Sequence, residues 1–185
     1  MPDAAMSISP DLITAEQLAR PPYSERSCQL VDGQVENVTP ASWRHGAVAG
    51  RIHGELYVWA KAHGGQVVGA ETGFVVRRNP DTVRAPDVAF LRAGRPVHAA
   101  PFVEGAPDLA VEVLSPDARA GATARMVRDY LLGGAAEVWV VDPENGTVTV
   151  HTPPNRAVVL GAGDALRGGE LLPGFALGLD ELFAD

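Results

Sequence analysis

The stretch "APDVAFLRAGRPVHAAPFVEGAPDLAVEVLSPD", residues 85–117, places acidic side chains beside or inside apolar segments. Asp87 follows Pro86 at the start of "DVAFL", and Glu112 lies inside "LAVEVL". We predict that both segments are strands and that they are neighbours in a sheet. A carboxylate inside an apolar strand is costly to bury unless it is protonated, paired or bound to a cation. The stretch therefore predicts either a metal site or a structural ion pair.

Carboxylate and main-chain carbonyl oxygens are the ligands that magnesium and manganese prefer. A cation held there could activate a water molecule and stabilise charge on a phosphoryl oxygen. Asp108 lies four residues before Glu112 and points to the same face of the strand, as a further ligand or as a solvated strand-end residue. The alternative is ordinary turn chemistry at the Pro-Asp pairs and a strand that runs into a capped helix.

Hydrophobic periodicity and turn residues predict a mixed α/β fold with a central sheet flanked by helices. In the first half of the chain we expect a helix capped by Thr14, a hairpin at 28–38, a helix from Thr39 and Pro40 to about 62, and strands within 66–91. A loop at 92–107 and a buried strand at 108–114 follow. The remaining predicted elements are a helix that starts at 115–117, a hairpin at 137–151, two weaker strands and a short terminal helix. The sequence has no glycine-rich phosphate loop, no G-x-S-x-G and no H-E-x-x-H motif.

Length and composition narrow the class of protein. The 185 residues fit one domain over 12–184 after an N-terminal tail of residues 1–11. A net charge of −8 gives no global positive field that would attract nucleic acid or anionic lipid. Cys28 is the only cysteine, which excludes an intrachain disulfide. Without a signal peptide or an apolar span, we expect a soluble, cytoplasmic protein that does not interact with membranes.

A run of motifs in order is more specific than any of these features. "APDVAF…PDLAVEVLSPD…RDYLLGGAAEVWVVDPENGTVTVH…LPGFALGLDELF" resembles the Uma family of "putative restriction endonucleases", within the PD-(D/E)XK nuclease superfamily. The resemblance covers roughly residues 12–184. It implies a restriction-endonuclease-like core, with a mixed sheet flanked by helices and preceded by a helix and a hairpin. The implied reaction is hydrolysis of a DNA phosphodiester that depends on Mg²⁺ or Mn²⁺.

The resemblance also assigns roles to matched positions. Asp87 corresponds to the metal-binding aspartate, and Glu112 to the acidic residue of the (D/E)XK element. The carbonyl of Val113 corresponds to a further metal ligand. Analogy with nucleases that cut both strands suggests a homodimer.

The sequence departs from the family pattern at the lysine. Leu114 stands at the lysine position of (D/E)XK, and family members commonly carry a lysine on the next helix, four residues before a tyrosine. Counting back from Tyr130 reaches Met126. Arg125 and Arg128 are the nearest basic residues, about 100° and 200° round that helix.

Gln29 is a second departure, because it stands where the family usually has glutamate, and a neutral amide weakens a metal site. His45 and His53, eight residues apart on one helix, are interpreted as polar helix residues rather than a metal pair. Five arginines flank the Asp87 strand and could meet phosphates but are expected to be solvated: Arg77, Arg78, Arg84, Arg92 and Arg95. Trp43, Trp59 and Trp139 follow the apolar periodicity and are expected in the core.

Three hypotheses follow. The first is a metal-dependent DNA endonuclease that uses Asp87 and Glu112, catalytically impaired where Met126 replaces the lysine. The second is a degenerate nuclease fold that acts as a non-catalytic nucleic-acid-binding or assembly module. A third, an unrelated structural α/β protein, requires the ordered run of motifs to be chance.

Overall fold

The computed structural model describes residues 12–97 and 100–184, so the predicted tail over residues 1–11 lies outside the described residues. The described helices are α1 (Ala15–Leu18), the 3₁₀ turn η1 (Tyr23–Glu25), α2 (Trp43–His63), α3 (Ala120–Leu132) and α4 (Leu179–Leu182). The mixed α/β class is confirmed, but the strands form three sheets where one central sheet was predicted.

The central sheet has the order β11-β10-β9-β8-β6-β3. Its strands are β3 (Gln66–Gly69), β6 (Val88–Leu91), β8 (Leu109–Val113), β9 (Glu137–Asp142), β10 (Thr147–Thr152) and β11 (Arg156–Leu160). It is a mixed sheet, because β8 and β9 run parallel while the other neighbouring pairs are antiparallel.

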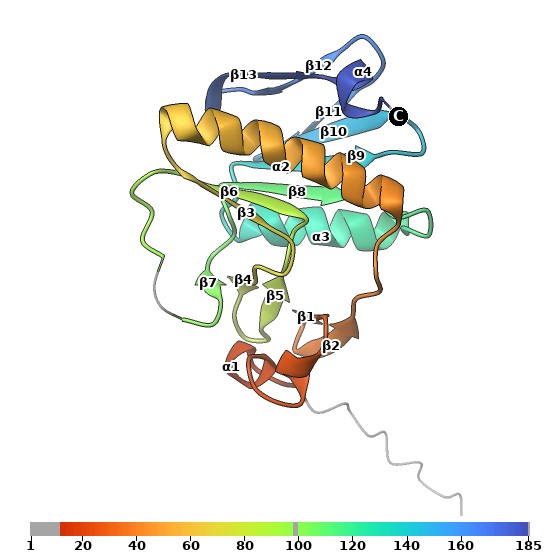
Figure 1. Ribbon diagram of the computed structural model, residues 1–185. Coiled ribbons are helices and arrows are strands. Elements are labelled where there is room, and N and C mark those ends of the chain that lie inside the picture. The colour runs from red at the N-terminus through yellow and green to blue at the C-terminus, as the bar shows by residue number, and fades with distance from the viewer. Residues whose placement is uncertain (1–11, 98–99, 185) are drawn as a thin grey trace, which may run out of the picture.

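The second sheet has the order β2-β1-β5-β4-β7 and lies on the N-terminal side of the molecule (Figure 1). Its strands are β1 (Cys28–Val31), β2 (Gln34–Asn37), β4 (Phe74–Arg77), β5 (Thr82–Arg84) and β7 (Val103–Glu104). A third, two-stranded sheet pairs β12 (Ala165–Gly168) with β13 (Leu172–Gly178).

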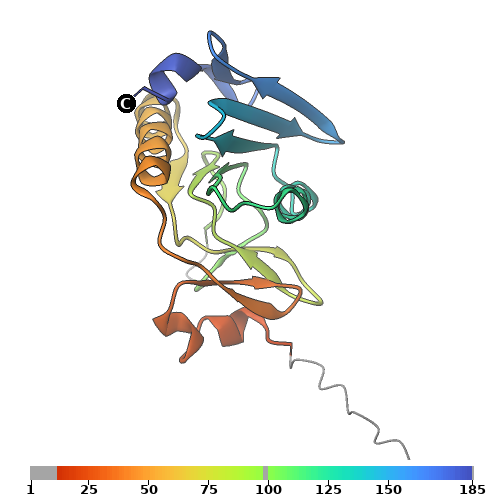
Figure 2. The same cartoon turned by 90° about the vertical axis from the view of Figure 1, so that its right-hand side faces the viewer.

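The central sheet lies between α2 and α3, as the side view shows (Figure 2). Side chains alternate along β8: Leu109, Val111 and Val113 join the apolar cluster that contains the buried residues of α2, whereas Ala110 joins the cluster that contains those of α3. This alternation explains why "DLAVEVL" is apolar throughout, since both faces of the strand are covered. It also directs the side chain of Glu112 toward α3.

Helix α2 follows from its apolar stripe. Val48, Ile52, Leu56 and Ala60 are spaced by one helical turn and are all buried, as predicted. The predicted N-cap, Thr39, is three residues too early, because the N-cap is Ser42. The Ser42 side chain accepts a hydrogen bond from the N–H of His45, in the first turn of the helix, at 3.3 Å.

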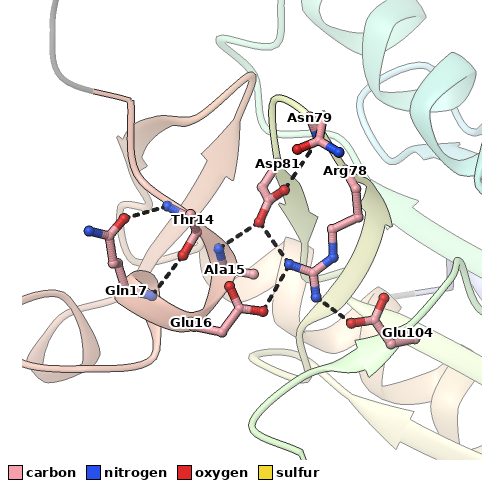
Figure 3. A network of polar contacts seen from close by, with 8 residues as sticks. All are labelled: Thr14, Ala15, Glu16, Gln17, Arg78, Asn79, Asp81 and Glu104. Carbon is pink, nitrogen blue, oxygen red and sulfur yellow. Dashed lines mark hydrogen bonds and ion pairs between the residues drawn. The ribbon is translucent and has the colours of Figure 1, made fainter.

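The N-terminal sheet is tied to its flanking helix by Arg78, in the turn between β4 and β5 (Figure 3). The Arg78 guanidinium contacts Asp81 at 2.8 Å, Glu16 of α1 at 2.9 Å, and Glu104 of β7. Asp81 also accepts the N–H of Ala15 at 2.9 Å. Three segments distant in sequence, the β4–β5 turn, α1 and β7, therefore meet at one arginine for which the sequence predicted only contact with solvent.

Three other sequence predictions need correction. Helix α3 begins at Ala120 and not at residues 115–117, and its N-cap residue, Arg119, makes no side-chain capping bond. Trp43 is 89% exposed and outside the core, whereas Trp139 is fully buried. The predicted loop at 92–107 contains β7, and the C-terminal region has three strands where two were predicted.

Among the helices of the described residues, none combines the length and the apolar character that crossing a lipid bilayer requires.

We expect Ile52→Ala to lower the free energy of unfolding by about 2–5 kcal/mol, because it leaves a cavity under α2. Ile52 is fully buried in the cluster between α2 and the central sheet. Val58→Ala, on the same helix but 65% exposed, should change it by less than about 0.5 kcal/mol. Urea denaturation of both variants checks this, and equal losses would contradict the assigned helix face.

Candidate active site

The two acidic residues meet where the chain passes from one sheet to the other. β5 ends at Arg84 in the N-terminal sheet, and β6 begins at Val88 in the central sheet, so Asp87 stands at the crossing. Val88 pairs with Val111 in the antiparallel β6–β8 ladder. One step further along this register, Asp87 is opposite Glu112, and directly opposed side chains lie on the same face of a sheet.

Asp87 takes the place of a missing strand partner. Because the β6–β8 ladder ends at the Val88–Val111 pair, the N–H of Val113 has no strand carbonyl on this side. The carboxylate oxygen Oδ2 of Asp87 accepts that N–H at 2.7 Å. The bond fixes the aspartate at the end of β8, on the edge that Glu112 occupies.

His45 reaches Asp87 from the other face of the sheet. Its Nε2 lies 3.2 Å from Asp87 Oδ2, and its side chain is 14% exposed. The hydrogen bond with Asp87 raises the pKa of His45, and a backbone hydrogen bond with Val113 and the charge of Glu112 act in the same direction, against the opposing effect of burial. These neighbours therefore make the imidazole easier to protonate than an ordinary histidine.

Glu112 is held by helix α3. The hydroxyl of Tyr130 donates to Glu112 Oε1 at 2.6 Å, and the tyrosine is fully buried. Burial and the negative charge of Asp87 raise the pKa of Glu112 to about 8, although the Tyr130 hydrogen bond and the charges of Arg84 and His45 lower it. Burial, together with the charge of Glu112, also raises the pKa of Tyr130. The hydroxyl stays protonated and serves as a donor.

Arg84 and Asp129, the residue before Tyr130 in α3, form a buried ion pair. Arg84 Nη2 and Nε lie 2.7 and 3.2 Å from Asp129 Oδ2, and the two side chains are 8% and 4% exposed. Arg84 Nη1 donates to the amide oxygen of Gln29 at 3.3 Å. The Gln29 oxygen is thus occupied by an arginine, and its amide nitrogen donates to the Ala85 carbonyl at 3.5 Å.

The remaining candidates lie elsewhere. Arg125 and Arg128 are exposed on α3, as is Lys61 on α2. Met126 is partly buried and packs against the apolar cluster under α3. Asp108 is at the other end of β8, roughly 13 Å along the strand from Glu112, and contacts Arg95 at 3.3 Å. His53 stacks on Tyr57.

The donor set fits a hydrated divalent cation in part. Over residues 12–97 and 100–184, no three His, Cys, Asp or Glu side chains gather so as to hold a metal ion by themselves. Magnesium, however, is commonly bound by one or two carboxylates, with water and phosphate as its other ligands. Among the described groups, none donates to Asp87 Oδ1 or Glu112 Oε2, so one oxygen of each carboxylate is available.

Sequence reasoning missed three of the residues that contact the carboxylates or their neighbours. Tyr130 served only as a marker for counting back to residue 126, and Arg84 and Asp129 were not linked. Arg84 was expected to be solvated but is buried in the Asp129 pair. His45 carried a signal, its match to a histidine often seen in the family, but its contact with Asp87 depends on how α2 crosses the sheet.

The sheet, the two flanking helices and the acidic strand ends define a nuclease-like fold. The crystal structure of a protein from Anabaena variabilis, described as a putative nuclease of DUF820, superposes with a TM-score of 0.81 at 20% identity, over 92% of this chain and 97% of that one. Residues 15–180 match the family model Uma2, described as "Putative restriction endonuclease", and the chain belongs to this family. No curated protein matches the sequence.

The raised pKa of Glu112 predicts a pH effect on stability in the metal-free protein. The folded protein keeps a proton on Glu112 up to about pH 8, whereas in the unfolded chain the pKa is near its usual 4.5. The free energy of unfolding should therefore fall as pH rises from 4.5 to 8. Glu112→Gln cannot lose this proton, so its decrease should be smaller by about 2–4 kcal/mol.

Urea denaturation in EDTA at pH 5 and pH 8.5 measures this difference. Glu36→Gln removes an exposed carboxylate on β2 and should follow the native protein at both pH values. Parallel pH profiles for the native protein and Glu112→Gln would contradict a raised pKa.

Proposed function

We propose that residues 12–184 form a single nuclease-like domain that hydrolyses phosphodiester bonds of DNA with Mg²⁺ or Mn²⁺. The observation that supports this most directly is the opposed pair of Asp87 and Glu112 at the strand ends, each with one available oxygen. These two carboxylates would hold the cation, with the carbonyl of Val113 as a further ligand.

When bound, the cation would activate a water molecule and stabilise charge on the phosphate. The residues of the chain prepare the site for it. His45 and the Val113 N–H orient Asp87 through Oδ2, which leaves Oδ1 directed elsewhere. Tyr130 orients Glu112 in the same way through Oε1. Because cleavage of both strands of a duplex needs two such sites, we propose that the protein acts as a homodimer.

A non-catalytic nucleic-acid-binding or assembly module is the second candidate. It is favoured by Met126, which packs among apolar side chains where the resemblance implies a lysine. Lys61, the only lysine of the chain, is exposed and near the C-terminal end of α2. In this case the carboxylate pair would remain without catalysis, and the raised pKa of Glu112 would keep one of the two acids neutral.

Cleavage of supercoiled plasmid with Mg²⁺ or Mn²⁺ tests the proposal. We expect the native protein to nick DNA, EDTA to stop it, and Asp87→Asn and Glu112→Gln each to lower the rate on the order of 100-fold or more. Asp108→Asn removes an acid from the opposite end of β8 and should leave the rate per folded molecule unchanged. Equal cleavage by native protein and Asp87→Asn, purified identically, would reveal a contaminating nuclease and overturn the proposal.

A further inference from the structure

We infer that two copies of this chain pair through the outward face of α2, with their α2 helices packed antiparallel about Gly50. The inference names the surface of the homodimer, and it rests on the proposed function only for the need for a second subunit. Six residues that share the outward side of the helix make up this face, which we call the seam: Trp43, Ala47, Gly50, Gly54, Tyr57 and Lys61.

The seam has the spacing of helices that pair along their length. Its residues are separated alternately by four and three positions, which is the spacing of the contact stripe in paired helices. The buried residues of α2 lie on the other side of the helix, against the central sheet. In Figure 2, α2 is at the edge of the molecule, with the sheets on one side of it only. The seam therefore faces outward.

Large apolar side chains are exposed to water at both ends of the seam. Trp43 is 89% exposed and Tyr57 is 52% exposed, and Val58 beside them is also exposed. Exposed apolar side chains that gather on one face mark an interaction surface, and aromatic residues are enriched in the contacts between proteins. Because Lys61 is the only charged residue of the seam, this face is poorly suited to phosphate contacts.

The seam is complementary to itself, which identifies its partner as a second copy of the chain. Trp43 and Tyr57 lie seven residues before and after Gly50. A two-fold axis beside Gly50 places Trp43 against Tyr57 of the partner subunit, and symmetry repeats the contact. Around the described atoms there is open space outside Gly50 and Gly54. Without side chains at these positions, the two helix axes can approach to about 8 Å.

Charges beside the seam fit the same arrangement. Arg44 and Glu55 are three helical turns apart and so share one flank of α2. Both are exposed, and among the described residues neither takes part in an ion pair. The two-fold axis brings Arg44 level with Glu55 of the partner subunit. Arg51, close to the axis, is turned aside and donates to the carbonyl of Leu182 at 3.0 Å.

Pairing through the seam leaves the candidate active site open. His45 is two residues from Trp43, or about 200° round the helix, so it projects from the opposite side of α2. There its Nε2 contacts Asp87. The dimer therefore carries two accessible carboxylate pairs, as cleavage of both strands of a duplex requires.

Sedimentation equilibrium in EDTA tests the pairing without DNA or metal. A single pair of helices buries less than the roughly 1,200–2,000 Å² of a stable interface, so we expect a Kd of about 10–100 μM. Between about 1 and 500 μM, the native protein should pass from the mass of one chain to twice that mass. A native protein that keeps the mass of one chain throughout would overturn the inference.

Gly50→Leu distinguishes the seam from any other surface. Leucine meets open space in the single chain and removes a helix glycine, which costs about 1 kcal/mol, but it separates the two paired helices. This variant should stay monomeric without a loss of Tm. Gly121→Leu, at a helix glycine of α3 that also has open space around it, should dimerise like the native protein. Native affinity in Gly50→Leu would overturn the inference.

An exchange of charges tests the antiparallel arrangement. Arg44→Glu and Glu55→Arg each bring like charges together, so each should raise the Kd about 5-fold. The double variant restores opposite charges in exchanged positions and should return to within about 2-fold of the native Kd. Losses that simply add in the double variant would overturn the two-fold arrangement about Gly50.

Plasmid cleavage separates this inference from the proposed function. Gly50→Leu keeps both carboxylates, so each chain should nick DNA at the native rate, but linear product should form about 10-fold more slowly because the second site is no longer joined to the first. Linear product at the native rate from a monomeric variant would overturn the role of the pairing in cleavage. If no variant cuts DNA, the nuclease function fails, and sedimentation alone decides the pairing.

Discussion

Repulsion between two carboxylates is the constraint on which the rest of this site depends. Asp87 and Glu112 oppose each other on two neighbouring strands. If both carboxyl groups were ionised without a cation nearby, their repulsion would destabilise the strand ends. The surroundings respond in two ways: Glu112 keeps its proton until about pH 8, and cationic or donor groups contact each acid. Under the proposed function, a divalent cation would offset the same charge directly, and this structural cost is one reason for proposing a cation site here.

The geometry of the site comes from a change of sheet. The chain leaves the N-terminal sheet at Arg84 and enters the central sheet at Val88, so the three residues between them are free of both ladders. One of these is Asp87, whose side chain completes the hydrogen bonding of β8 where β6 has not yet begun. The two helices then contact the strand ends from opposite faces, α2 through His45 and α3 through Tyr130.

Much of the fold was predictable because its signals are local. The apolar stripe of α2, the Asp-Gly and Asn-Gly turns and the continuous apolar run of β8 each depend on a few consecutive residues. The errors fell where the signal is ambiguous. A Pro-Asp pair after a strand can start a helix or only a turn, and here the helix begins at Ala120. Trp43 matched an apolar periodicity but precedes the first buried turn of α2.

The family, the mixed α/β class and the two acidic candidates could be predicted from the amino-acid sequence, since a carboxylate within an apolar strand is conspicuous whatever surrounds it. The hydrogen-bond and ion-pair partners of these acids became visible only in the folded chain. His45, Arg84 and Tyr130 lie 42, 3 and 43 residues from Asp87 in the chain, and none carries a local signal of its contact. Ion pairs and hydrogen bonds depend on distances of about 3 Å, and such distances are set by how helices and sheets pack.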